Sequence, residues 1–133
     1  KIRNPKYTRP WQHVLEPLRG YMLLAQKMFM EKKYDEAWNF GPDLQSVKDV
    51  GSITEVFIKQ WGSGKWIDCS NLEDKHEAKL LSLDVLKADL MLNWKSKMGA
   101  DKIIEYTADW YKRSQTEEAY KLCLEQIRDY ERL

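Results

Sequence analysis

The chain has 133 residues, the size of a single domain with room for a hydrophobic core. Its 22 Lys and Arg residues balance 21 Asp and Glu residues, and a net charge of +1 gives no reason to expect a surface for nucleic acid. No apolar run approaches the roughly 20 residues of a membrane span, and the N-terminus lacks the apolar region of a signal peptide. We therefore expect a cytoplasmic protein with neither a nucleic-acid nor a membrane partner.

The first helix is predicted from a proline pattern and an apolar repeat. Residues 1–3 are extended, and Pro5 and Pro10 keep the following backbone out of a helix. Pro17 suits a first helical turn, and apolar residues then recur at helical spacing: Leu18, Met22, Ala25 and Phe29. We expect this helix to end near residues 32–33. Gly20 inside it costs about 1 kcal/mol relative to alanine, which suggests a close approach of another group.

Three short strands and four further helices are predicted after it. The apolar run "AWNFG", residues 37–41, predicts a buried strand that a Gly-Pro-Asp turn closes, and segments 65–69 and 80–83 predict two more strands. A helix is expected to carry Val50, Ile53, Phe57 and Trp61 and to stop at Gly62. Asp84 is expected to cap a helix that runs to about Leu92. Further helices are predicted over 100–114 and from Thr116 to the apolar residues ending at Tyr130.

Residues 1–133 are therefore expected to form one mostly helical α+β domain. Strands so few cannot form an independent sheet, so we expect them to pair with further chain. The two cysteines, Cys69 and Cys123, lie outside any C-x-x-C or Cys/His spacing, which predicts buried thiols of a reduced protein and no metal site.

No catalytic residue is predicted from motifs, because the chain lacks G-x-S-x-G, H-E-x-x-H, a P-loop and G-x-G-x-x-G. His76 and Glu77 are adjacent, and on an extended segment their side chains point to opposite faces, so they do not form a dyad. For His76 taken alone, a surface or structural role is the alternative to a functional one. Arg9 precedes Pro10 and Trp11 on stiff backbone, and its planar fork suits a phosphate or a carboxylate. The alternative is a surface arginine stacked on Trp11.

Four ordered segments carry a family resemblance. The stretch "RNPKYTRPWQHVLEPLRGYMLLAQ" closely resembles a segment of the CDP-glucose 4,6-dehydratases, a branch of the extended short-chain dehydrogenase/reductases. Similar to the same family are "AWNFGP", "KHEAKLLSLDVLKADLMLNW" and the C-terminal "YKLCLEQIRDYERL". The resemblance covers essentially the whole chain. It implies the C-terminal substrate-binding portion of such an enzyme, without a complete Rossmann domain.

The resemblance also implies site residues. In the family an arginine at the position of Arg9 contacts the pyrophosphate of the sugar nucleotide. The His-Glu segment lies near the nucleotide half of the pocket, so His76 and Glu77 are carried over, and Asn39 follows from the strand motif. The resemblance further implies that Trp11, Val14, Leu15 and Leu18 are scaffold.

In this family NAD binds to an N-terminal Rossmann half, and a Tyr-x-x-x-Lys pair drives hydride transfer. None of the seven tyrosines is followed four positions later by lysine, so we expect no NAD on this chain and no catalysis by it alone. The implied parent converts CDP-D-glucose to CDP-4-keto-6-deoxy-D-glucose. Implied partners are CDP-glucose or a similar sugar nucleotide, the missing N-terminal half and a second copy in a homo-oligomer. The alternatives are another sugar-nucleotide epimerase, reductase or dehydratase, and a non-catalytic, stand-alone helical binding module.

Overall fold

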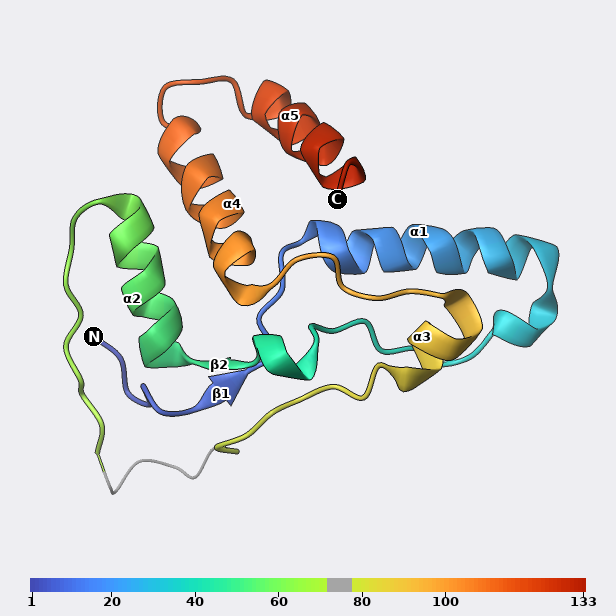
Figure 1. Cartoon of the computed structure of the whole chain (residues 1–133), viewed down its shortest axis with the longest axis horizontal. Helices are drawn as coiled ribbons and strands as arrows, with labels where there is room; N and C mark the ends of the chain where they lie inside the picture. The colour runs from blue at the N-terminus through green and yellow to red at the C-terminus, as the bar shows by residue number, and fades with distance from the viewer. Residues whose placement is uncertain (72–77) are drawn as a thin grey trace.

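The computed structural model describes residues 1–71 and 78–133, which form a mostly helical α+β domain (Figure 1). The helices of this part of the chain are α1 (Leu15–Met30), α2 (Val50–Trp61), α3 (Leu86–Leu92), α4 (Ala100–Arg113) and α5 (Ala119–Glu131). Two short 3₁₀ helices occur, η1 (Lys32–Tyr34) and η2 (Leu44–Ser46). The strands β1 (Thr8–Arg9) and β2 (Lys48–Asp49) pair antiparallel, with Thr8 opposite Asp49 and Arg9 opposite Lys48.

The predicted helices are confirmed, with small shifts at their ends. In α1, Pro17 lies in the first turn as expected, but the helix stops at Met30, and the residues after it form η1. The Asp49 carboxylate caps α2 by accepting the Ser52 N–H at 2.8 Å. Gly62 ends α2 with a φ of 93°, a left-handed conformation that glycine adopts without strain.

The three predicted strands are wrong. Segments 37–41, 65–69 and 80–83 contain no strand, and the latter two make only the isolated bridges Ile2–Asp68 and Thr8–Leu80. The apolar character of segment 37–41 reflects burial of Phe40 and partial burial of Trp38 without a backbone ladder. The observed β1–β2 pair was not predicted, because two-residue strands carry no alternation pattern.

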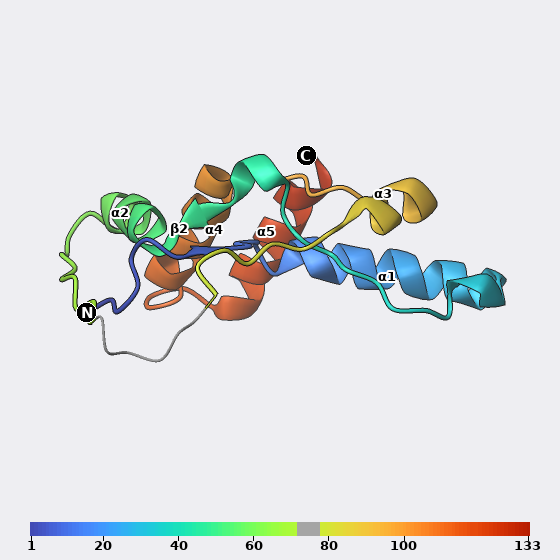
Figure 2. The same cartoon turned by 90° about the horizontal axis from the view of Figure 1, so that it is seen from below.

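Two apolar clusters hold the elements together. One lies where α2, α4 and α5 meet the start of α1, and its buried members are Ile53, Met98, Ala100, Ile103, Ile104 and Tyr130. The other lies between the rest of α1 and α3, and its buried members are Tyr34, Phe40, Ala88, Leu92 and Trp94. Figure 2 shows α1 extending away from the α2, α4 and α5 group, with α3 beside it. The helix α1 therefore belongs to both clusters.

Gly20 confirms the expected close approach. A Cβ at this position would lie 2.5 Å from the Phe40 ring, a distance that real Cβ atoms do not show. The phenyl ring itself packs edge to face on Trp94, with centroids 5.0 Å apart. Glycine at position 20 thus lets the second cluster pack directly on the α1 backbone.

Several side chains are more exposed than the sequence suggested. Trp11 and Leu15 pack on the first cluster, as expected for scaffold, but Val14 and Leu18 are exposed. Other apolar residues of α1 are exposed as well, among them Tyr21, Met22, Met28, Phe29 and Met30. Cys123 is exposed and Cys69 half-buried, so the prediction of two buried thiols is wrong.

Candidate functional site

Arg9 lies on β1 and is half-buried. Its Nη1 donates to the Thr8 carbonyl oxygen at 2.8 Å and to the Ala78 carbonyl oxygen at 3.1 Å. The guanidinium carbon is 5.7 Å from the centroid of the Tyr7 ring. The Trp11 indole N–H donates to the Lys48 carbonyl oxygen at 3.0 Å, so Trp11 ties the start of the chain to β2. Arg9 is thereby fixed against the segment that begins at residue 78.

Asn39 contacts the other end of that segment. Its Nδ2 donates to the Asp84 carbonyl oxygen at 3.2 Å. Segment 78–84 therefore runs from Arg9 to Asn39, and an extended chain of six steps spans up to about 20 Å. His76 and Glu77 lie outside the described residues, although Ala78 follows Glu77 directly in the sequence. The structure thus relates Arg9 and Asn39 through one segment without bringing them into contact.

A cavity of about 540 Å³ opens beside Asp84, and we call it the Asp84 cavity. Its walls come from 41–44, 82–89 and 94–96, with the polar side chains of Asp43, Ser82, Asp84, Asp89, Lys95 and Ser96. Lys95 and Asp89 form an ion pair with a 3.2 Å N to O distance. Carboxylate oxygens accept hydrogen bonds from hydroxyl groups, so the lining suits a sugar or ribose better than a phosphate. The wall residue Leu44 begins η2, which leads into β2 and its pairing with Arg9.

A buried carboxylate lies behind this cavity. Glu16, in the first turn of α1, is 0% exposed, and its Oε1 accepts the backbone N–H groups of Lys97 and Met98 at 2.8 Å each. Its Oε2 accepts the Tyr130 hydroxyl at 2.8 Å. Burial and this hydrogen bond raise the pKa of Tyr130 to about 12, so its proton stays in place. We call these groups, together with Arg19, the Glu16 network.

Arg19 completes the Glu16 network one turn further along α1. Its Nε donates to the Tyr130 oxygen at 2.9 Å, and its Nη2 donates to the Lys95 carbonyl oxygen. The Arg19 and Glu16 side chains approach to 4.0 Å, and the guanidinium carbon is 5.4 Å from the Trp94 ring centroid. Sequence patterns did not indicate this network, because Glu16 and its partner Tyr130 are 114 residues apart, beyond the reach of any local pattern.

His13 is buried at the same helix start, with 7% of its surface exposed. Burial lowers its pKa, and the nearby Glu16 charge opposes that shift to a smaller degree. The Leu15 N–H donates to its Nδ1 at 3.4 Å, and its ring meets Tyr106 edge to face at 5.7 Å. Among the described residues, no group of three or more His, Cys, Asp or Glu side chains could hold a metal ion. His13 thus packs at the start of α1, and burial favours its neutral form.

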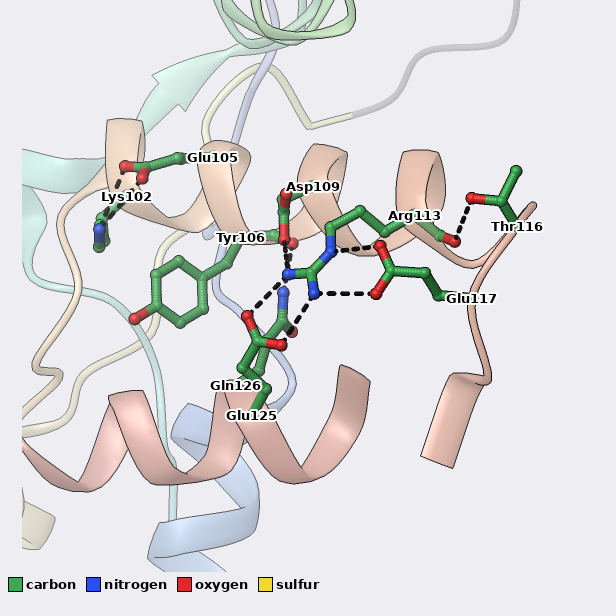
Figure 3. Close-up of polar contacts among 9 residues, drawn as sticks. All are labelled: Lys102, Glu105, Tyr106, Asp109, Arg113, Thr116, Glu117, Glu125 and Gln126. Atoms are coloured by element: carbon green, nitrogen blue, oxygen red, sulfur yellow. Dashed lines mark hydrogen bonds and ion pairs between the residues drawn. The ribbon is translucent and has the colours of Figure 1, made fainter. Parts of the chain in front are cut away.

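Arg113 forms a second polar cluster at the end of α4 (Figure 3). It makes two bidentate pairs, with Glu117 at 2.9 and 3.0 Å and with Glu125 at 2.7 and 2.8 Å, and it contacts Asp109 at 3.3 Å. These bonds raise the pKa of Arg113 and lower the pKa values of both glutamates. The cluster ties α4 to α5. Asp109, Arg113 and Glu117 follow one another at intervals of four residues, and this spacing of opposite charges could have predicted part of the cluster from the sequence.

Lowering the pH is expected to release the Arg113 cluster. Because the folded pKa values of Glu117 and Glu125 lie below 4.5, their stabilisation is complete above that pH and is lost as the pH falls further. We expect Arg113→Met to lower the melting temperature by a few degrees at about pH 7. The difference from wild type should shrink at about pH 3 in circular dichroism melts. An equal difference at both pH values would contradict the ionic origin.

The chain was compared with known proteins and protein families. No protein-family model matches the chain. The chain is similar to a CDP-glucose 4,6-dehydratase of Salmonella typhimurium strain LT2. Their alignment runs over 133 residues, covers 97% of the chain and has 39% identity. This similarity confirms the predicted resemblance. The chain spans 36% of the length of this dehydratase, about a third. No helix in the described part of the chain is both long and apolar enough to cross a membrane.

Proposed function

We propose that the chain is the substrate-binding, C-terminal portion of an NAD-dependent CDP-D-glucose 4,6-dehydratase of the extended short-chain dehydrogenase/reductase type. The product of the whole enzyme would be CDP-4-keto-6-deoxy-D-glucose. The observation that carries this proposal is the 39% identity to a CDP-glucose 4,6-dehydratase along nearly the whole chain. The share of that protein that the chain spans supports a part and not the whole of such an enzyme.

The geometry supports different binding roles for the two ends of segment 78–84. Arg9 at one end offers a planar guanidinium for the pyrophosphate. At the other end, Asn39 and the carboxylates of the Asp84 cavity offer partners for sugar or ribose hydroxyls. His76 and Glu77 belong to the proposal only through the resemblance. The role of this chain is thus to bind and orient the sugar nucleotide.

The residues of this chain do not fit NAD. Neither the glycine-rich turn that receives a pyrophosphate at a helix start nor a Tyr-x-x-x-Lys pair is present in the sequence. We therefore assign no catalytic step to this chain, and we place the cofactor in the N-terminal Rossmann half of the proposed enzyme. The exposed apolar residues of α1 support the proposal that this helix is covered in the whole enzyme, either by the N-terminal half or by a second copy in a homo-oligomer.

Comparing three sugar nucleotides tests the proposal. The full-length protein is given CDP-glucose, dTDP-glucose and UDP-glucose separately, with NAD, and formation of the 4-keto product is measured. We expect kcat/KM for CDP-glucose to exceed the other two by at least about tenfold, a difference of about 1.4 kcal/mol. Equal or faster turnover of another substrate would overturn the CDP assignment. Binding of CDP-glucose without formation of a 4-keto product would support the binding role and contradict the dehydratase activity.

A further inference from the structure

The wall of the Asp84 cavity between α3 and α4 has no regular secondary structure. Trp94, Lys95 and Ser96 line the cavity, and Trp94 is 0% exposed. Asn93 leaves α3 in the left-handed conformation, with a φ of 52°. Because helix or strand bonds do not fix segment 94–98, its shape depends on the groups that contact it from outside.

The α3 residues Ala88 and Asp89 contact Trp94 and Lys95, and two residues of α1 supply further contacts along the segment. Glu16 accepts the N–H groups of Lys97 and Met98, whereas Arg19 donates to the Lys95 carbonyl oxygen and lies against the Trp94 ring. Positions 16 and 19 are three apart and therefore share one face of the helix. The wall segment is thus attached to α1 on both sides of Ser96.

Tyr130 holds Glu16 and Arg19, the two α1 residues that contact the wall segment, in place. The Tyr130 hydroxyl donates to Glu16 and accepts from Arg19, at 2.8 and 2.9 Å. With its carboxylate 0% exposed and its hydrogen bonds made, Glu16 has little freedom to move. Arg19 is half-buried, with 28% of its side chain exposed. Hydrogen bonds to two sequence-distant residues, Tyr130 and Lys95, therefore fix the orientation of the guanidinium.

We infer that Arg19 is a positioning residue for sugar-nucleotide binding, which sets the places of Trp94 and Lys95 in the cavity wall. The inference rests on the proposed function. Arg19 acts through the Lys95 carbonyl and the Trp94 ring, and it is not among the residues that line the cavity. A displaced wall weakens binding because polar partners placed about 1 Å off lose most of their contribution.

The test uses Arg19→Met in the full-length protein, with Arg113→Met as the matched control. Arg113→Met also removes an arginine that anchors α5, but from a cluster that does not touch the wall. In protein labelled with 5-fluorotryptophan, the fluorine resonance of Trp94 is identified through Trp94→Phe. We expect Arg19→Met to move this resonance and to raise the KM for CDP-glucose about tenfold, with kcat within about twofold of wild type. Arg19→Lys, which keeps one donor to Lys95, should recover part of the KM.

Three results would be decisive against the inference or its basis. If both variants raise KM equally, general loosening of the fold explains the effect and the positioning role is overturned. If the Trp94 resonance moves while KM stays unchanged beside an active wild type, the wall is not part of the binding site. Wild-type protein that binds none of the three sugar nucleotides would instead contradict the proposed function.

Discussion

Replacing Glu16 by alanine is expected to lower the free energy of unfolding by about 3 to 5 kcal/mol, because it breaks a buried charged network. The substitution leaves the N–H groups of Lys97 and Met98 and the hydroxyl of Tyr130 without their acceptor. Each buried donor left unpaired costs about 1 to 3 kcal/mol. The measurement is urea-induced unfolding of the full-length protein, followed by tryptophan fluorescence.

Two variants make the Glu16 result specific. Glu16→Gln keeps an oxygen for Lys97 and Met98 and loses the acceptor of Tyr130 and the charge beside Arg19, so its loss of stability should be clearly smaller. Glu118→Ala removes an exposed glutamate at the start of another helix, and we expect a change within about 0.5 kcal/mol. A Glu16→Ala protein as stable as Glu118→Ala would show that the network does not stabilise the fold.

Replacing Arg9 by alanine in the full-length protein is expected to raise the KM for CDP-glucose by about tenfold to a hundredfold. A charge-assisted bidentate contact to a phosphate contributes about 1.5 to 3 kcal/mol, which corresponds to that range. The affinity for NAD should stay the same, because we place the NAD site in another part of the enzyme. Steady-state kinetics with varied CDP-glucose, and NAD binding by calorimetry, provide the two measurements.

Further variants distinguish a direct role of Arg9 in substrate binding from an effect of its loss on the fold. Arg9 also donates to two backbone carbonyls, so its loss could loosen segment 78–80. Arg9→Lys keeps the charge without the fork and should recover less than half of the lost binding energy. Arg132→Ala, at an exposed site on the last helical turn, is the control that should leave KM unchanged. A lower melting temperature with unchanged KM for Arg9→Ala would assign Arg9 a purely structural role.

The helices could be predicted from sequence because their signals are local. The apolar repeat of α1, the Gly62 stop of α2 and the apolar residues of α5 each depend on residues within a few turns. The strands could not be predicted in this way. A short apolar run such as 37–41 indicates burial, but whether it forms a ladder depends on partners elsewhere in the chain. In this protein Phe40 contributes its side chain to the second cluster and its carbonyl to Gln12.

The candidate site was predictable only in part. Arg9 was proposed from its neighbours Pro10 and Trp11 as well as from the resemblance, and Asn39 was proposed from the resemblance alone. The structure adds that segment 78–84 connects them. The cavity beside Asp84 combines three separate segments, and the contact of Arg19 with Lys95 joins residues 76 apart in the sequence. No pattern within a single segment reports such contacts. The Arg113 cluster, in contrast, was accessible from the helical spacing of its charges.

The position of Tyr130 has a consequence for synthesis of the protein. During translation α1 leaves the ribosome long before α5, so Glu16 lacks the Tyr130 hydroxyl as a donor until more than a hundred further residues have been added. The second apolar cluster can pack on α1 before α5 is made, because its residues precede α5 in the chain. The hydrogen bonds of Tyr130 to Glu16 and Arg19, which complete the support of segment 94–98, form only after the last helix has been made.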